Sequence, residues 1–308
     1  MLHRIHGFNR SRQPPDWAAE LITAKIQRLT GTRDTRMAYA EPLGDPGMFG
    51  PHSIVWRVHR QFLVMMAGGM SSLLLQSLHP QALAAVWDHS HIQTNLRGRL
   101  GRTASFIAAT TYGPTDMAHA AIAQVNSIHA RIQGIGPDGL AYRANDPDLL
   151  MWVHVAEVHA FVQAHQWLSR QPLSASEIDV YVSEMALVAE CLGVTDAPRT
   201  WAHLLAQLNA HRGDLRFDDR AATVHRLLMD FPVDWWDRPL MQALLATAQD
   251  LLPVWVWPLL QRSPAPAWRQ QAHRRTIQAA SLSIQWALER EGVSAVAARR
   301  VAGTPKPT

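Results

Sequence analysis

Apolar residues recur at helical spacing along most of this chain, and this pattern constrains the fold more than any other feature. Helix start signals accompany it: Pro114 opens one segment, Asp146-Pro147 opens another, and Ser174 with Glu177 forms a capping-box pattern. No segment shows the sustained alternation of apolar and polar residues that a half-buried strand requires. No internal repeat and no linker divides the chain. We therefore predict an all-α fold in a single multi-helix domain.

The expected organisation is an N-terminal helix and arm over 1–35, the helical domain over 36–292 and a flexible tail over 293–308. Within the apolar run 62–78, the Gly68-Gly69 pair is expected to separate two buried helices. The predicted helices have these approximate bounds: 16–29, 53–67, 70–78, 81–88, 99–111, 114–133, 147–169, 174–193, 198–211, 219–229, 237–251 and 275–291.

Composition narrows the classes of function. Hydrophobic residues make up 47% of the 308 and charged residues 18%, so a large core is expected and global disorder is not. The net charge is only +4, and the arginines are spread along the chain without forming a basic stripe. We therefore expect no nucleic-acid partner. The single cysteine, Cys191, excludes an intramolecular disulfide and any multi-cysteine zinc site.

The sequence also bears on location. The apolar run 62–78 contains glycine, serine and glutamine and is short for a bilayer span. The first residues lack the apolar stretch of a secretory signal. We expect a soluble, cytoplasmic protein without a transmembrane span, with peripheral membrane contact through Trp255 and Trp257 as an option.

His129 is the first candidate for chemistry. On the helix expected over 114–133 its neighbours one and two turns away are apolar, so its side chain should point inward. A buried neutral imidazole needs a partner for each nitrogen, because an unpaired buried polar group costs about 1–3 kcal/mol. Two interpretations follow from spacing alone. His129 is either a core histidine bonded to a backbone carbonyl or a metal ligand.

A second set of polar residues shares a face of the preceding helix: Arg99 and Thr103 align with Phe106 and Thr110, and Arg102 lies beside them. A buried arginine keeps its proton and needs an anion. Few carboxylates are near in sequence, so a ligand carboxylate could supply that charge. The alternative is an arginine whose head reaches the surface at the start of a helix.

His154 lies on the apolar stripe of the helix expected over 147–169. His154 and His159 are five residues apart and so do not share a helix face, as a zinc-protease pair must. Glu157 and His159 are two apart, which does not match the Glu-Xaa-Xaa-His motif of di-iron bundles. A non-haem metal site in this segment is therefore the weaker interpretation.

Taken together, several segments resemble the MpaB-type oxygenases and latex-clearing rubber oxygenases. The resemblance is dense over about 44–170 and weaker to about 260, and its motifs occur in the order typical of that family. The segments that carry it are 44–47, 50–58, 68–80, 89–90, 99–103, 129–134 and 138–154.

This resemblance implies an all-helical domain that encloses one b-type haem, with His129 as the ligand of the iron. It also implies that Arg99, Arg102 and Thr103 line the haem pocket. There the arginines would anchor propionates or polarise oxygen, and Thr103 would donate a hydrogen bond. We assign His154 to the same cofactor-binding set.

Two departures from the family pattern qualify the resemblance. Rubber oxygenases have a lysine where Arg102 stands, and an arginine has no lone pair to offer to iron. Rubber oxygenases also use a pocket glutamate as a base. The segment 81–87 has no carboxylate, and Asp88 is only a loose substitute, so cleavage of polyisoprene is not expected.

The sequence thus predicts a haem-b-dependent oxygenase that uses O₂ on an apolar, unsaturated or isoprenoid-like small molecule. Two alternatives stay open at this point. One is a haem carrier or sensor without turnover, and the other is a helical interaction module without a cofactor, in which His129 is a satisfied core residue.

Overall fold

A computed structural model describes residues 19–20, 22–24, 26 and 36–303, and it is helical throughout except for one hairpin. The predicted all-α single domain is confirmed. The elements of the described residues, in chain order, are η1 (Arg36–Tyr39), α2 (Ile54–His59), α3 (Phe62–Gln76), α4 (Pro80–His89), α5 (Leu96–Tyr112), α6 (Thr115–His129), β1 (Gln133–Ile135), β2 (Ala141–Arg143), α7 (Pro147–Leu168), α8 (Ala175–Cys191), α9 (Trp201–Ala210), η2 (His211–Gly213), α10 (Asp219–Met229), α11 (Arg238–Asp250), η3 (Val254–Val256), α12 (Ala267–Glu291) and α13 (Val293–Val301).

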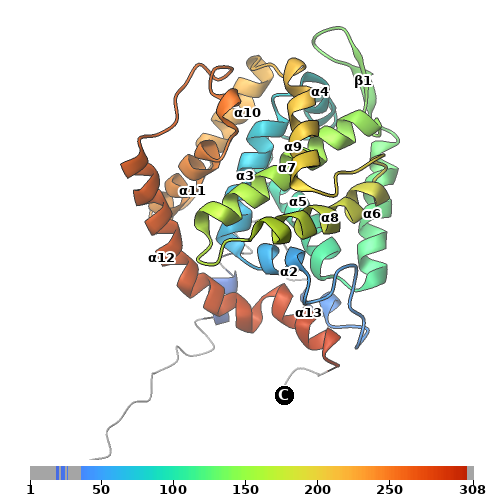
Figure 1. The fold of residues 1–308 in the computed structure, drawn as a ribbon, viewed down its shortest axis with the longest axis vertical. Helices are drawn as coiled ribbons and strands as arrows, with labels where there is room; N and C mark the ends of the chain where they lie inside the picture. The colour runs from blue at the N-terminus through green and yellow to red at the C-terminus, as the bar shows by residue number, and fades with distance from the viewer. Residues whose placement is uncertain (1–18, 21, 25, 27–35, 304–308) are drawn as a thin grey trace, which may run out of the picture.

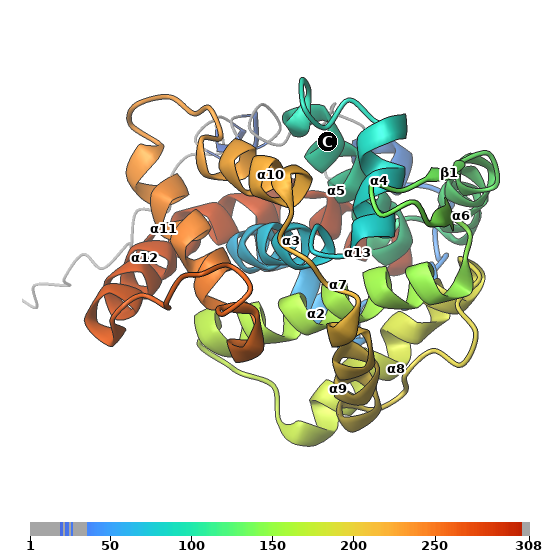
Figure 2. The same cartoon turned by 90° about the horizontal axis from the view of Figure 1, so that it is seen from above.

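Helix α3 occupies the centre of the molecule, and the other helices surround it (Figure 1, Figure 2). It packs most extensively against α7, and also against α11 and α12. Both α3 and α7 are apolar on most of their surface, which is the pattern of a helix buried on all sides. The hydrophobic core therefore forms around this pair.

The predicted break at Gly68-Gly69 is wrong. Helix α3 passes through both glycines, and the breaks fall instead at Arg60-Gln61 and after Gln76. At Gly68 a β-carbon would lie 2.6 Å from Cδ1 of Phe161 and 3.2 Å from its Cα. A side chain does not fit at position 68, because α7 approaches the α3 backbone there. The role of Gly68 is therefore in helix packing and not in ending a helix.

A hairpin follows α6, which ends at His129 rather than at residue 133. Strands β1 and β2 are antiparallel, with Gly134 opposite Tyr142. The Tyr142 ring covers Gly134, where a β-carbon would lie 2.5 Å from the hydroxyl oxygen. The same hydroxyl donates to Oδ2 of Asp88 at 2.9 Å, which fixes the hairpin on α4.

The other helix signals hold. Ser53 caps α2, Asp146 and Pro147 open α7, and Ser174 with Glu177 forms the expected capping box. The described residues of the helix expected over 16–29 are helical, and the rest of that segment lies outside the described residues. Most of the expected arm over 1–35 and residues 304–308 also lie outside the described residues.

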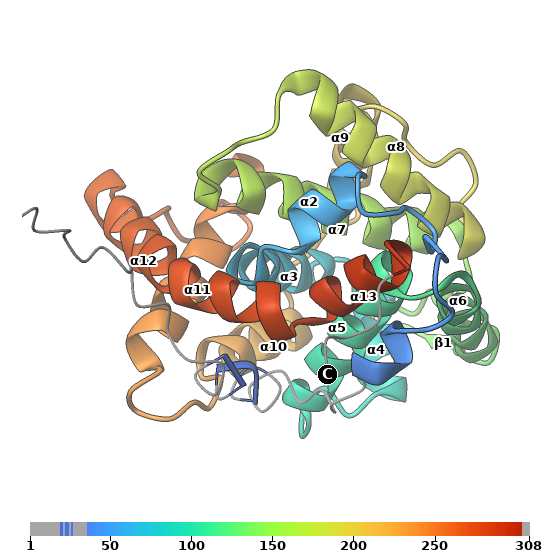
Figure 3. The ribbon, with the colours of Figure 1, turned by 90° about the horizontal axis from the view of Figure 1, so that it is seen from below.

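The structure differs from the expected tail over 293–308, because α13 continues the fold as far as Val301. Arg300 attaches this helix to the rest of the fold. Its side chain is almost fully buried, and its guanidinium donates hydrogen bonds to backbone oxygens of distant segments. These oxygens are those of Tyr39 and Tyr112 at 2.9 Å and of Asp45 at 2.9 Å. Figure 3 shows α13 next to α5 and η1, the segments that this arginine joins.

Among the described residues, no helix taken alone has the length and hydropathy to cross a membrane. Helices α3 and α4 meet this criterion of length and hydropathy only when they are taken together, and the pair is bent by 105°. The two tryptophans considered for membrane contact pack against the protein. Trp257 is buried, and the Arg212 guanidinium lies over the ring of half-buried Trp255 at 5.0 Å.

The two neighbouring glycines allow a matched test of the α3–α7 contact. Gly68→Ala should lower the free energy of unfolding by about 1–3 kcal/mol, because the added carbon overlaps Phe161. Gly69→Ala meets nothing within 4 Å and should raise it by about 0.5–1 kcal/mol, as alanine does inside a helix. Urea unfolding of both variants measures this. Equal effects of the two substitutions would contradict the packing role of Gly68.

Arg300 provides a second test. Arg300→Met keeps the length of the side chain but leaves several buried carbonyls without a donor, so unfolding free energy should fall by about 3 kcal/mol. Arg275→Met on the exposed side of α12 is the control, with an expected change within about 0.5 kcal/mol. Denaturation midpoints that do not differ between these variants would show that α13 is not held by Arg300.

Candidate functional site

A small internal cavity of about 80 Å³ brings together histidines from α2, α6 and α7. Its polar lining consists of His59, His129, His154, Glu157 and two threonines of α5. We call it the imidazole cavity. The rest of its wall is apolar and consists of Phe49, Phe106, Ile107, Leu150, Val153, Met185, Val188, Ala189, Leu192 and Val194.

His129 is the last residue of α6 and is half-buried. Its predicted inward orientation is consistent with burial along the helix, where Ala118 and Ile122 are buried and Val125 is half-buried. The Nδ1 atom is buried and has no hydrogen-bond partner among the described residues. Burial, and then the charge of Arg99, lowers the pKa of the ring. His129 is therefore a neutral imidazole with one unsatisfied nitrogen.

His154 faces the same cavity from α7 and is buried. Its Nε2 atom also has no partner in the described part of the chain. Burial lowers its pKa to about 4, so the ring is neutral near pH 7 and keeps a lone pair. The structure thus places the two histidines singled out in the sequence on one cavity wall.

Glu157 is a residue of this cavity that the sequence analysis dismissed. It lies on α7 one turn after His154, and no described residue forms a hydrogen bond with its carboxyl. Burial raises its pKa to about 7. Its position three residues after His154 is the signal that could have identified it, since residues three apart on a helix share a face. Glu157 is therefore poised to gain or lose a proton near neutral pH.

Arg99 is the other charged group near His129. Its side chain is half-buried, and burial, with the charge of Arg102, lowers its pKa to about 10. No ion pair or hydrogen bond joins the Arg99 guanidinium to any residue that the structure describes. A cation in such a position lacks the anion that burial requires. Arg102 is exposed on the next turn of α5.

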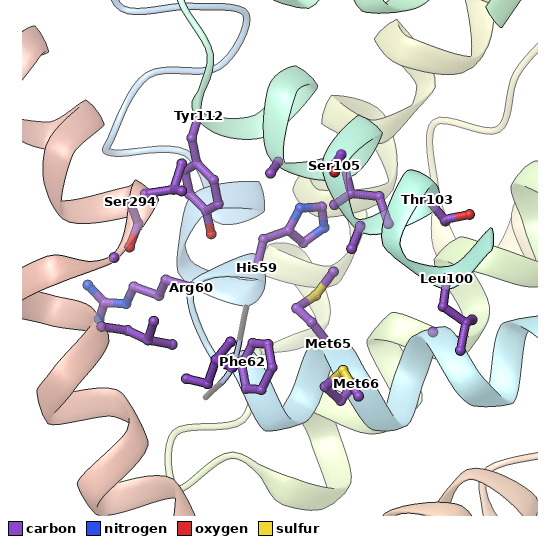
Figure 4. A pocket seen from close by; sticks show the side chains of 18 of the residues that line it. His59, Arg60, Phe62, Met65, Met66, Leu100, Thr103, Ser105, Tyr112 and Ser294 are labelled. Carbon is purple, nitrogen blue, oxygen red and sulfur yellow. The ribbon is translucent and has the colours of Figure 1, made fainter. Parts of the chain in front are cut away.

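Thr103 does not line the imidazole cavity. It is exposed on α5, and its hydroxyl donates to the Arg99 carbonyl of its own helix at 3.3 Å. It borders a second cavity of about 280 Å³ (Figure 4). We call this the methionine cavity, because Met65, Met66 and Met70 of α3 lie along it.

The methionine cavity is mainly apolar. Figure 4 shows Phe62, Met65 and Met66 on α3 below it and Tyr112 entering from α5 above. Its further apolar lining includes Leu100, Ile107, Phe161, Phe231 and Leu288. Few polar side chains reach it, as is common in sites for apolar small molecules.

His59 separates the two cavities and lines both. Its Nδ1 atom lies 2.7 Å from the hydroxyl of Thr111, and its Nε2 atom lies 2.9 Å from the hydroxyl of Tyr181. Burial lowers its pKa to about 3, so the ring is neutral and one nitrogen donates while the other accepts. Because both nitrogens are occupied, His59 is a structural divider and not a free ligand.

The loop over 44–47 positions α6 and hence His129. Asp45 accepts hydrogen bonds from the Thr115 backbone and hydroxyl at 2.9 and 2.7 Å, at the first residue of α6. Its backbone carbonyl in turn receives the Arg300 guanidinium. Gly47 has φ of +69°, and a β-carbon there would lie 2.3 Å from the Gly113 carbonyl oxygen. Position 47 therefore requires a glycine, because its positive φ and the nearby Gly113 carbonyl leave no room for a side chain.

Asp88, considered as a loose substitute for the family's pocket glutamate, is engaged elsewhere. Its carboxylate accepts from Tyr142 at 2.9 Å and lies 3.3 Å from Arg220. It does not border the imidazole cavity. Within the residues that line this cavity, Glu157 supplies the carboxyl.

Comparison with known proteins identifies the class. The model of the catalytic domain of the ER-bound oxygenase mpaB/B′ and rubber oxygenase family matches residues 56–282. The chain belongs to this family, which confirms the resemblance seen in the sequence. The matched region contains α3, α5, α6 and α7, and therefore most of the lining of both cavities. Neither the curated proteins nor the solved structures include a significant match.

The raised pKa of Glu157 predicts a pH dependence of stability. The folded protein holds this proton up to about pH 7 and the unfolded chain releases it near pH 4.3, so the ionisation destabilises the fold as pH rises through that window. Glu157→Gln cannot ionise, and its advantage over the unchanged protein should grow by about 2 kcal/mol between about pH 5 and about pH 8.

Urea unfolding at the two pH values measures this difference. Glu177→Gln is a control whose effect should be nearly the same at both pH values, because the hydrogen bond from Arg57 lowers the pKa of the half-buried Glu177 to about 2. Its carboxylate stabilises the fold at neutral pH, and this contribution is lost as pH falls toward about 2. A Glu157→Gln advantage that is the same at both pH values would contradict the buried, protonatable state of Glu157.

Proposed function

We propose that this protein is a haem-b-dependent oxygenase that acts with O₂ on an apolar, unsaturated or isoprenoid-like small molecule. Membership of an oxygenase family supports the reaction class. The observation that carries the haem is the pairing of an unsatisfied, buried imidazole nitrogen on His129 with Arg99, a half-buried cation that has no anion among the described residues.

The chemistry of these groups fits a haem. A neutral imidazole with a free lone pair is the most common protein ligand of haem iron. A propionate would supply the carboxylate that Arg99 lacks, and Arg102 on the exposed turn could reach a second one. His154 adds a second neutral imidazole to the cavity wall. When bound, the haem would supply the activation of O₂.

The space is smaller than a porphyrin requires, since ligand pockets usually enclose about 300–1,000 Å³ and the imidazole cavity has about 80 Å³. The proposal therefore requires the cavity to widen. Helix α6 is the element suited to move, because few of its side chains are buried and it packs chiefly on α5. At its C-terminal end one side-chain bond, from Asn126 to the Cys191 carbonyl, joins it to α8.

The residues around the two cavities have separable roles in this proposal. The apolar methionine cavity would hold the substrate and exclude water, and His59 would keep the two compartments apart. Glu157, with a pKa near 7, would take or return a proton beside the cofactor. Thr103 borders the methionine cavity, so its role would be toward substrate. Cytoplasmic location remains a prediction.

The haem proposal is tested by absorption spectroscopy. The purified protein, supplied with haem, should show a Soret band, and His129→Ala should remove or strongly shift it because the ligand to iron is lost. His119→Ala, an exposed histidine on the same helix, is the matched control and should leave the band unchanged. A colourless protein, or a band indifferent to His129→Ala, would refute the assignment.

Oxygen uptake separates an oxygenase from the alternatives. Squalene, an unsaturated isoprenoid, should give O₂ consumption that requires the haem-loaded protein and is lost in His129→Ala. A Soret band without uptake of O₂ would favour a haem carrier or sensor. No haem and no uptake would favour the interaction module.

A further inference from the structure

A second group of metal-ligating side chains lies outside the two cavities. His79, His211 and Asp214 each offer one ligand atom, and these atoms all lie within 4.8 Å of one another. His79 is at the corner between α3 and α4, His211 opens η2 after α9, and Asp214 follows η2. The three residues come from two segments that are far apart in the sequence.

The two imidazoles are buried, and one nitrogen of His79 is unsatisfied. His79 is 4% exposed and His211 is 5% exposed. Neither ring forms a hydrogen bond with a described residue, and Nδ1 of His79 is completely buried. An imidazole that is removed from water without a partner costs about 1–3 kcal/mol. The unsatisfied His79 ring beside His211 and Asp214 therefore points to a ligand.

The backbone holds these segments together independently of the side chains. The Arg216 amide donates to the Leu78 carbonyl at 2.8 Å, one residue from His79 and two from Asp214. Leu215 is almost fully buried beside this bond. The α3–α4 corner and the segment after η2 are thus held next to each other by the backbone. The positions of the three ligand atoms do not depend on a mobile loop.

The surroundings favour a cation. Trp152 of α7 forms one wall, with its ring centroid 6.0 Å from that of His79 and 5.5 Å from that of His211. The exposed Asp214 lies on the open side of the group, and the Asp148 carboxylate lies 3.9 Å from Nε2 of His211. Two carboxylates and two imidazoles give the site oxygen and nitrogen donors, and the exposed Asp214 opens it to solvent.

We propose that His79, His211 and Asp214 form a site for a divalent first-row metal ion, and that the ion is Zn²⁺. Two imidazoles and one carboxylate are a common zinc donor set, with a water or Asp148 for the fourth position. The ion would join the α3–α4 corner to the end of α9, beside the first turns of α7. Its role is structural, because neither cavity described above borders it.

The test is calorimetric titration of ZnCl₂ into untagged full-length protein that has been treated with a chelator. One zinc ion per chain should bind, and its binding should raise the melting temperature. Asp214→Asn, at an exposed position, should weaken binding at least about tenfold. His79→Ala should abolish it. His52→Ala, an exposed histidine far from the group in sequence, is the control and should bind as the unchanged protein does.

The outcomes are decisive and separate from the haem proposal. Absence of saturable zinc binding in the unchanged protein would overturn the site, as would equal affinity of Asp214→Asn and the unchanged protein. The Soret band should be the same in Asp214→Asn as in the unchanged protein, and His129→Ala should bind zinc normally. Failure of one site would therefore leave the other standing.

Discussion

The close contact between α3 and α7 is the constraint on which the rest of this structure depends. Gly68 allows the two helix backbones to approach at Phe161, and both helices are consequently buried over most of their length. Helix α7 carries His154 and Glu157, while α3 carries the methionines of the larger cavity. The core pair thus fixes one wall of each cavity, and α5 and α6 complete them.

Two buried imidazole nitrogens without partners lie on the wall of the imidazole cavity. A buried imidazole, carboxyl or guanidinium normally has a hydrogen-bond partner, because a lost bond is expensive in a low-dielectric interior. Here one nitrogen of His129 and one of His154 lack a partner within the described residues, although the neighbouring His59 is bonded at both nitrogens. In our proposal the first two rings face a ligand, while His59 belongs to the scaffold.

Much of the fold was predictable from local signals. The capping box at Ser174, the Asp146-Pro147 start of α7 and the stripe that turns His129 inward each depend on residues within a few turns. The misread features depend on distant partners. Gly68 resembles a helix break until Phe161 is placed against it, and α13 resembles a tail until Arg300 finds carbonyls near the N-terminal end. The pairing of His79 with His211 became visible only when separate segments were brought together, whereas the spacing of Glu157 from His154 on α7 was a local signal that went unused.

The central claim is that His129 binds the iron of a haem in the widened imidazole cavity. A crystal structure of the haem-loaded protein tests it most directly. We predict iron bonded to a nitrogen of His129, a propionate paired with Arg99, and α6 displaced away from α7. Iron bonded to His154 or another residue, or a haem seated outside this cavity while His129 keeps its present surroundings, would contradict the account.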